Sequence, residues 1–246
     1  NDHLDWHGSK MNYLNSKFII FRLQAKNHFA LINKNLKNIF RKKGFASKLI
    51  LPKEKDYEKV KFKIKNDYLT SNINSENMSF IYTFSKLIGV KDKNFINMMK
   101  SFRGLPHRFE IFLKRNDITF INDSKATSFK ATDSALTDLK NIYWILGGLP
   151  KKGDKLSLSK HRKNITKCYL IGKNIKFFKN QIKNKLVFSI TKNLKNSVIK
   201  ILKDCKSDKR TSKFVLLSPA AASFDQFPNF EKRGDEFKRL CKKYAK

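Results

Sequence analysis

The segment ITFINDSKAT, residues 118–127, decides the fold of the second half of this chain. Its first four residues are apolar or β-branched and predict a strand. Residues 128–139 follow, with three apolar side chains on roughly one face of a predicted helix. Between strand and helix, residues 122–127 bring together an acid, an amine and two hydroxyls. Ligands of open α/β sheets collect beyond the carboxyl ends of strands, so this turn predicts a binding site.

Strands and helices alternate along the rest of this half. We expect strands at 109–113, 118–121, 142–146, 168–171, 186–190 and 214–217, with a helix after each from the second onward, including 193–204 and 230–243. This alternation indicates βαβ units. It predicts an α/β fold, a Rossmann-like and mostly parallel sheet with helices on both faces. The pattern changes at Gly104-Leu105-Pro106, so we place a boundary between domains 1–103 and 104–246.

The first domain is less regular. Residues 25–70 are rich in Lys and hold two short apolar runs, 29–32 and 49–51, which predict short strands joined by basic connectors. An apolar helix should end just before Gly89, the residue type that helices favour after their last turn. A second helix is expected at 93–102.

The chain begins with a cluster of possible metal ligands. Four of them stand within six positions: Asp2, His3, Asp5 and His7. A predicted helix follows, in which Tyr13 and Lys17 are four positions apart and share a face. Histidine and carboxylates can bind a divalent cation, although carboxylates hold Mg²⁺ through few contacts. From the residues alone, a polar turn that caps the helix is the favoured interpretation.

Composition sets broad limits on function. The 246 residues carry a net charge of +34, as expected of a nucleic-acid-binding protein. However, most of the basic residues are Lys and they are spread through every segment, whereas phosphate and base recognition favours the planar fork of Arg. Drift in the coding sequence is therefore the simpler interpretation, and we expect no nucleic-acid partner.

The cysteines and the apolar runs indicate where in the cell the protein is expected. The three cysteines fit neither a disulfide framework nor a CxxC metal site, which favours a reducing, cytoplasmic setting. The sequence contains no run of eighteen apolar residues, so we expect no membrane span. We also expect a monomer.

Three polar turns directly follow predicted strands: residues 123–127, 147–152 and 218–227. Their small residues let backbone N–H groups approach an anion closely, and a helix amino terminus adds favourable partial charge. At one edge of a sheet they would form a single cleft suited to carboxylate or phosphate. Residues 148–153 have the glycine spacing of a phosphate loop, but Asp154 and Lys155 replace the required Lys and Ser/Thr.

Several ordered motifs resemble the Mur ligase family. Residues 104–110, 122–127, 147–148 and 217–234 are similar to the carboxy-terminal domain of these enzymes. Residues 2–9 and 13–17 resemble the second half of the central ATPase domain. The resemblance covers nearly the whole chain and is greatest to the members that add D-glutamate. It implies an incomplete α/β ATPase domain in 1–103 and an amino-acid-binding domain in 104–246.

The resemblance implies an ATP-dependent carbon–nitrogen ligase of peptidoglycan precursor synthesis, with ATP and Mg²⁺ as cofactors. ATP would phosphorylate the carboxylate of UDP-N-acetylmuramoyl-L-alanine, and the amine of D-glutamate would attack the acyl phosphate. Such chemistry needs positive charge around the phosphoryl group and an ordered amine.

The family's functional residues carry over to matching positions. His3 and Lys17, the latter as a carbamate, resemble ligands of Mg²⁺, and with Lys125 they are the candidate catalytic residues. The residues similar to nucleotide contacts are Asn74, Asn77, Arg108 and Asp123, although Ile73 replaces the usual His. The residues similar to the D-glutamate pocket are Thr127, Lys151, Ser223, Phe224 and Phe230, with Lys152 as the alternative to Lys151.

The family's amino-terminal domain, phosphate loop and first acidic Mg²⁺ ligand have no counterpart in these residues. We therefore expect the chain to be part of a longer ligase and to be inactive alone. Two alternatives stay open. One is a sibling Mur or folylpolyglutamate-type ligase for another amino acid, against which the content of residues 223–230 argues. The other is a non-catalytic basic module that binds nucleic acid.

Overall fold

A computed structural model describes residues 4–71, 74–158 and 161–245. The chain forms two compact units, Asn1–Phe102 and Arg103–Lys246. The division lies one residue before the boundary expected from the sequence.

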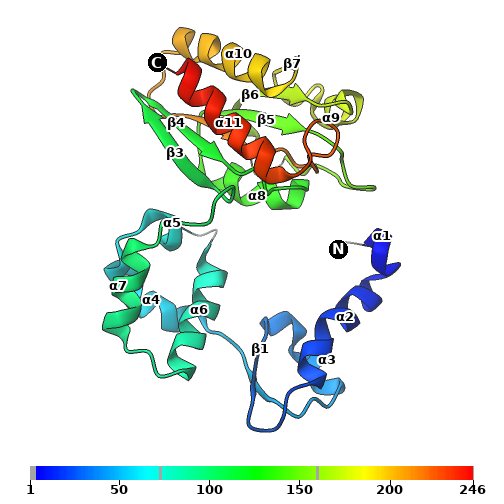
Figure 1. The fold of residues 1–246 in the computed structure, drawn as a ribbon, viewed down its shortest axis with the longest axis vertical. Coiled ribbons are helices and arrows are strands. Elements are labelled where there is room, and N and C mark those ends of the chain that lie inside the picture. The colour runs from blue at the N-terminus through cyan, green and yellow to red at the C-terminus, as the bar shows by residue number, and fades with distance from the viewer. Residues whose placement is uncertain (1–3, 72–73, 159–160, 246) are drawn as a thin grey trace. The chain divides into compact units, whose positions relative to one another are not determined.

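The second unit is built on a six-stranded sheet (Figure 1). The strands are β3 Glu110–Arg115, β4 Ile118–Asn122, β5 Ile142–Gly147, β6 Ile165–Ile171, β7 Phe188–Lys192 and β8 Lys213–Leu217. Their order is β3-β4-β8-β5-β6-β7, and every neighbouring pair is parallel except β3 and β4. The predicted α/β class and mostly parallel sheet are thus confirmed.

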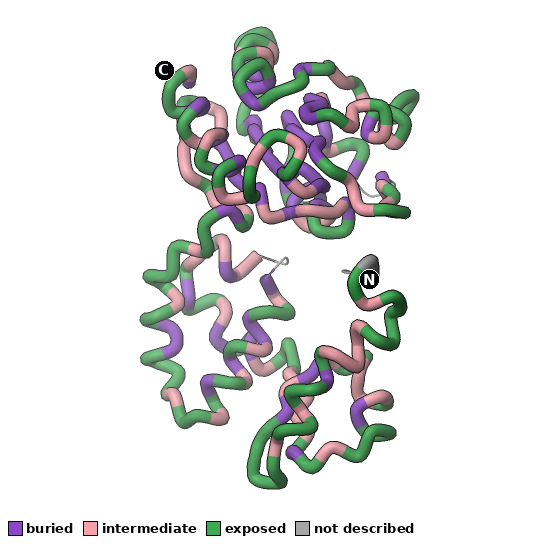
Figure 2. The backbone as a smooth tube through the Cα atoms, turned by 45° about the vertical axis from the view of Figure 1, so that its right-hand side comes forward, coloured by how far each residue is buried: buried purple, intermediate pink, exposed green. Residues whose placement is uncertain are grey.

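Helices cover both faces of this sheet, as predicted. α8 (Phe129–Asp138) and α9 (Ile175–Ile182) pack against the face that carries Trp144. α10 (Leu194–Ser207) and α11 (Phe230–Tyr244) pack against the other face, beside Tyr143. Successive side chains of a strand point to opposite faces, so the fully buried strand β5 supplies both cores. Within the second unit, Figure 2 shows the buried segments concentrated at the centre, where the strands lie.

One predicted helix is absent. Between β5 and β6, the described residues form no α-helix and only the short 3₁₀ helix η3 (Arg162–Asn164). Pro150 and Gly153 interrupt this stretch, and Leu158 is buried in the core below α8 and α9. The amide of Leu156 donates to the side chain of Gln181 on α9 (3.2 Å). Tertiary contacts therefore hold this segment in an extended form that lacks a helical repeat.

The first unit is mostly helical, with one small parallel sheet. Its elements are α1 Leu4–His7, α2 Lys10–Arg22, β1 Phe29–Leu31, η1 Lys34–Leu36, α3 Lys37–Lys42, β2 Lys48–Ile50, α4 Glu54–Ile64, α5 Asp67–Thr70, α6 Ser75–Leu87 and α7 Asp92–Ser101. Helices α4, α6 and α7 share a core around Tyr57, Met78 and Phe95. Gly89 follows α6 with φ +78°, which confirms the predicted helix end.

The prediction for residues 25–70 was wrong in part. The two short strands are present, but α3, α4 and α5 replace the expected connectors. In α4 the buried residues Tyr57, Val60 and Ile64 recur at helical spacing, and the lysines between them mask that repeat. Over the described part of the chain, no helix has the length and apolar character needed to traverse a lipid bilayer.

Candidate functional site

The three polar turns lie at one edge of the sheet. Strands β4, β8 and β5 are neighbours and parallel, so their carboxyl ends are adjacent. The Asp123 amide donates to the Leu217 carbonyl (2.8 Å), and the Gly147 amide donates to the Pro219 carbonyl (2.9 Å). Backbone hydrogen bonds therefore join each turn to the next, and the single polar edge expected from the sequence is present.

Glycines make the close approach of two of these turns possible. Gly147 and Gly148 have φ of +134° and +136°, in the region that L side chains rarely adopt. A Cβ on Gly148 would collide with the Ala222 carbonyl. Next to it, Leu149 and Ala222 exchange two backbone hydrogen bonds of 2.9 and 3.0 Å. This contact places the small residues of the 218–223 turn beside the turn after β5.

Asp123 occupies the junction of β4 and β8. One carboxylate oxygen accepts from the Ser218 hydroxyl (2.7 Å), and the other accepts from the Phe109 amide (3.1 Å). Burial raises the pKa of this carboxyl group to about 7, although both hydrogen bonds and the charge of Arg108 act to lower it. Asp123 is thus a proton-exchanging group near neutral pH within a basic edge.

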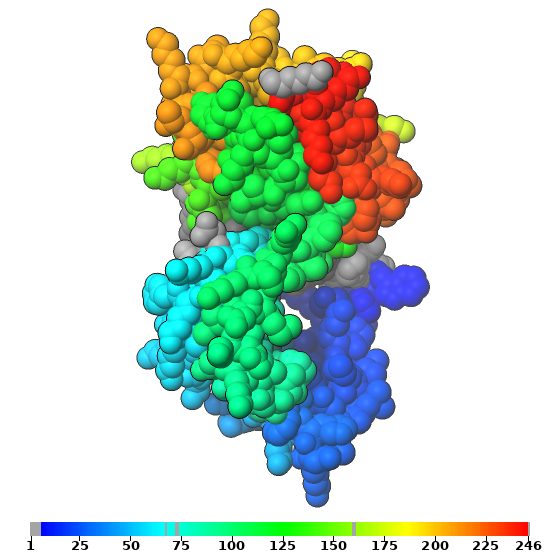
Figure 3. All heavy atoms as spheres, turned by 60° about the vertical axis from the view of Figure 1, so that its left-hand side comes forward, coloured from blue at the N-terminus to red at the C-terminus, as the bar shows by residue number. Residues whose placement is uncertain are grey.

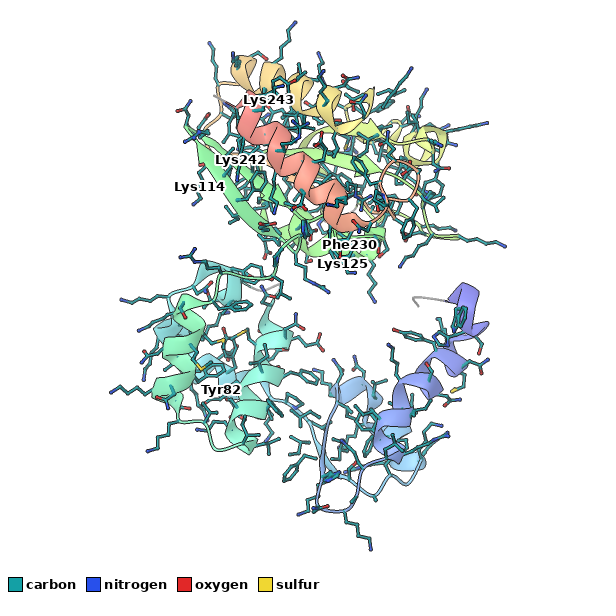
Figure 4. All side chains as sticks on the ribbon, in the orientation of Figure 1. Tyr82, Lys114, Lys125, Phe230, Lys242 and Lys243 are labelled. Atoms are coloured by element: carbon teal, nitrogen blue, oxygen red, sulfur yellow. The ribbon has the colours of Figure 1, made fainter. Side chains whose placement is uncertain are left out.

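Lys125 and Phe230 meet although they are far apart in sequence. The Lys125 Nζ lies 4.0 Å from the centre of the Phe230 ring, and Figure 4 shows the two side chains together. The Ser124 hydroxyl donates to the Phe230 carbonyl (2.8 Å), which ties the start of α11 to the turn after β4. Asn229 caps the helix there, because its side chain accepts from the Lys232 amide.

Arg233 is a buried cation that the sequence did not identify as a site residue. It is 1% exposed. Its Nε donates to the Ser124 hydroxyl (2.9 Å), and one terminal nitrogen donates to the carbonyls of Ser124 (2.8 Å) and Ala221 (3.0 Å). Burial lowers its pKa to about 10, against the opposing charge of Asp225. Among 54 basic residues, only its place within residues 217–234, which carry part of the family resemblance, could have drawn attention to it.

A second buried network supports the segment that enters β3. Asn122 Nδ2 lies 3.0 Å from both His107 Nδ1 and a Glu110 carboxylate oxygen, and the His107 amide donates to the same oxygen (3.0 Å). Burial opposes the charge of Glu110, but the His107 amide and Lys238 outweigh it and lower its pKa. The Lys125 amide donates to the His107 carbonyl (3.0 Å), so this network also positions Lys125.

The predicted amino-acid pocket is spread over the same turns. Thr127 and Lys151 are partly buried, whereas Lys152 is exposed. The turns that carry them meet, because the Phe129 amide donates to Asp154 (2.8 Å). Two further members come from the turn after β8: Ser223, which is buried, and Phe224, which is 70% exposed.

The remaining predicted nucleotide contact in the second unit is Arg108. It is exposed, and its amide donates to the Leu105 carbonyl (3.2 Å). Its charge acts on Asp123, so the structure brings these two predicted residues into one neighbourhood.

The first unit holds the other four predicted site residues, His3, Lys17, Asn74 and Asn77. Lys17 is exposed on α2, with its Nζ 5.5 Å from the centre of the Tyr13 ring. The Asn74 amide group donates to the Tyr68 carbonyl (2.7 Å), so it serves its own loop, while Asn77 is exposed on α6. His3 lies outside the described residues, as does Asp2. Within the described ranges, no three His, Cys, Asp or Glu side chains gather closely enough to hold a metal ion.

The edge of the second unit has the chemistry of an anion-binding site. The small residues of the turns let them pack closely together, and Lys125, Lys151, Arg108 and Arg233 supply positive charge around them. Charge of this sign can neutralise a carboxylate or a phosphoryl group, and aromatic Phe230 fixes one of the amines.

Curated relatives were found over nearly the whole chain. It is 35% identical over 258 residues to the UDP-N-acetylmuramoylalanine–D-glutamate ligase of Wolbachia sp. subsp. Brugia malayi (strain TRS), covering 98% of this chain and 51% of that protein. It is 31% identical over 269 residues to the ligase of the same name from Rickettsia felis (strain ATCC VR-1525 / URRWXCal2), covering 99% of this chain and 59% of that protein. The chain thus spans between half and three-fifths of the length of these relatives. No family model matches it.

Solved structures with the same fold include two ligases. The MurF ligase from Thermotoga maritima in complex with ADP aligns with 98% of this chain and 60% of its own, at a TM-score of 0.64 and 11% identity. MurF from Acinetobacter baumannii aligns with 96% of this chain and 57% of its own, at a TM-score of 0.65 and 11% identity. At this identity the likeness describes the fold alone.

Proposed function

Because this chain belongs to the Mur ligase family, we propose that it is the part of an ATP-dependent ligase that binds the incoming amino acid, D-glutamate. The whole ligase would join D-glutamate to UDP-N-acetylmuramoyl-L-alanine through an acyl phosphate, in the cytoplasm and as a monomer. The second unit would be the amino-acid-binding domain, and the first unit would be the second half of the central ATP-binding domain. The observation that carries the proposal is the single cationic edge formed by the turns after β4, β5 and β8.

D-Glutamate is an anion with two carboxylates and one amine, and the edge offers a matching set of groups. We assign Lys151 to the side-chain carboxylate, and Thr127 with the backbone of Ser223 and Phe224 to the rest of the amino acid. Phe230 bounds the pocket and holds Lys125 by its ring. Lys125 would lie close to the reacting groups, where its charge would stabilise the transition state.

ATP is proposed as the phosphoryl donor. In the second unit, Arg108 would contact phosphate and Asp123 would accept from ribose hydroxyls. Asp123 already accepts one hydrogen bond at each oxygen, and a carboxylate oxygen can accept two. In the first unit, exposed Asn77 is the stronger candidate for a nucleotide contact, because the side chain of Asn74 is engaged by its own loop.

Mg²⁺ is the proposed metal cofactor, and it would neutralise phosphate charge. Lys17 could supply one anionic oxygen ligand as a carbamate, and its exposure on α2 leaves its amine accessible for that modification. The described residues alone do not form a metal site. His3, outside the described residues, is the other ligand that this chain would supply.

The test is a chimeric ligase. These 246 residues would replace the matching part of the Wolbachia protein. Phosphate release would be measured with ATP, Mg²⁺ and UDP-N-acetylmuramoyl-L-alanine, and with D-Glu, L-Glu, L-Lys and diaminopimelate in turn. We expect turnover with D-Glu only. Lys151→Ala should raise the KM for D-Glu, whereas Lys152→Ala, its exposed neighbour, serves as the matched control.

Other outcomes would redirect the proposal. Turnover with another amino acid would keep the mechanism and assign a sibling activity. A folded chimera that turns over none of them would contradict the ligase proposal and favour a basic binding module, whose affinity for nucleic acid should fall steeply with salt.

A further inference from the structure

A cavity of about 590 Å³ lies at the opposite edge of the sheet, within the second unit. It is lined by the starts of β4 and β8, the hairpin between β3 and β4, and the last turns of α10 and α11. Both helices follow strands of a parallel sheet, so they begin at the carboxyl edge and end at the amino edge. The length of the strands therefore separates this cavity from the candidate site.

The inner wall of the cavity is apolar and fixed. Phe120 is fully buried and Cys205 is 2% exposed, and both belong to the core below α10 and α11. Ile199 and Leu202 on α10 and Tyr244 on α11 continue this wall outward. Figure 3 shows β3 (green) against α11 (red), the two segments that border the cavity on one side. A volume of this size with such a wall suits a small organic ligand.

The rim of the cavity is cationic. Lys203 and Lys206 are three positions apart on α10 and thus share a face, and Arg115 stands at the end of β3. The acid of the lining, Asp117, is already paired with buried Lys213 (2.6 Å). Among the described residues, no acidic side chain pairs with Lys203, Lys206 or Arg115. Two carboxylates, Asp117 and Asp208, act on Cys205 in the cavity wall, but they pair with Lys213 and Arg210. The three rim cations are therefore not paired with any described carboxylate.

The partial negative charge of two helix ends would disfavour an anion in the cavity, but nearby basic residues counter it. The carboxyl termini of α10 and α11 carry partial negative charge. Basic residues in their last turns, Lys206 in α10 and Lys242 and Lys243 in α11, oppose it.

We propose that this cavity binds an organic phosphate with an aromatic body, at a site separate from the ligase site and beyond the proposed function. The ring would pack against Ile199, Leu202 and Tyr244, and the phosphate would contact Lys203, Lys206 and Arg115. A dianion is the preferred charge because three cations on two elements surround the opening, and Arg and Lys both bind phosphate through charge-assisted hydrogen bonds.

The test titrates the full chain with 1-naphthyl phosphate and measures binding by isothermal titration calorimetry. The ionic strength is about 0.15 M, at which interactions between exposed charges more than about 8 Å apart are largely screened. We expect saturable 1:1 binding. Lys203→Ala/Lys206→Ala should weaken binding by roughly tenfold or more, because two charge-assisted contacts are lost. The matched control, Lys183→Ala/Lys195→Ala, removes the same charge from exposed positions outside the cavity and should leave binding unchanged.

Two further arms locate the ligand. Ile199→Trp fills the mouth of the cavity from an exposed position and should abolish binding, whereas Lys125→Met in the candidate site should leave it unchanged. If inorganic phosphate bound as tightly as 1-naphthyl phosphate, the proposed contact between the ring and the apolar wall would be wrong. If 1-naphthol bound as tightly, the proposed contact between the phosphate and the cationic rim would be wrong. Absence of binding, or equal weakening by the control pair, would overturn the site itself. None of these results depends on whether the ligase proposal holds.

Discussion

The Nζ of Lys125 lies 4.0 Å from the ring centre of Phe230, which joins the turn after β4 to the first residue of α11. A cation over an aromatic face stabilises by about 0.5–2 kcal/mol, depending on how far it is desolvated. The ring also approaches His107 edge-on, with the ring centres 5.9 Å apart. Phe230 therefore restricts the position of the Lys125 amine in the candidate site.

A double-mutant cycle tests this contact. We expect Lys125→Met and Phe230→Leu to show a coupling of about 1 kcal/mol in the free energy of unfolding. Fluorescence of Trp144 can follow unfolding of the second unit, because that side chain is fully buried while Trp6 is 86% exposed. The control is the same cycle on Lys243 and Tyr244, where the Lys243 Nζ lies 5.4 Å from the centre of the Tyr244 ring. Equal coupling in the two pairs would contradict a special role for Lys125.

Arg233 should be required for the stability of the second unit. Arg233→Met leaves the Ser124 and Ala221 carbonyls without their buried donor. Each buried group left unsatisfied costs about 1–3 kcal/mol, so for the two carbonyls we expect a loss of roughly 2–6 kcal/mol by denaturant unfolding. Arg239→Met, on the exposed side of the same helix, is the matched control and should not change stability measurably. Equal stability of the two variants would show that Arg233 is not a structural tie.

The positions of the strands and the polar edge were predictable because they depend on local patterns. Apolar runs mark β4, β5 and β8, and polar residues follow each of them directly. Parallel pairing then forces the three turns to one edge whatever the detailed packing. The meeting of the turns after β4 and β8 thus follows from topology alone.

What could not be predicted depends on tertiary contacts. The lysines interspersed in α4 obscure its apolar face in the sequence. That face becomes evident only from the common burial of Tyr57, Val60 and Ile64 in the structure. In the same way, the burial of Arg233 could not be predicted, because it is set by contacts with Ser124 and Ala221 from distant turns. The non-helical segment before β6 is fixed by contacts with α8 and α9.

Gly148 should not tolerate a side chain. In Gly148→Ala the new Cβ would meet the Ala222 carbonyl, and the backbone φ of +136° is itself unfavourable. We expect a loss well above the about 1–2 kcal/mol that a left-handed residue costs in open space. Gly153→Ala is the matched control, because its φ is +75° but nothing lies within 4 Å of the added Cβ. Thermal unfolding of both variants checks this, and equal midpoints would argue against the close approach of the two turns.

Asp123 should give the stability of the second unit a distinctive pH dependence. Its pKa is raised from 3.8 to about 7 by burial, so between these values the folded state holds a proton that the unfolded state has lost. A group that binds more protons in the folded state makes stability fall as pH rises. Its contribution is therefore fully present below about pH 4 and is lost progressively as pH approaches and passes 7.

Asp123→Asn removes this titration while retaining an oxygen that can accept from Ser218 or Phe109. Denaturant unfolding of the chain and the variant should be followed through Trp144 at intervals from pH 4 to pH 8. The difference in unfolding free energy between the two should change across this window, with the variant gaining relative stability toward pH 8. Ser218→Ala serves as a second variant, because it removes a hydrogen bond that holds the pKa down and should shift the change to higher pH. A difference that stays constant over the window would mean that folding does not raise the pKa of Asp123.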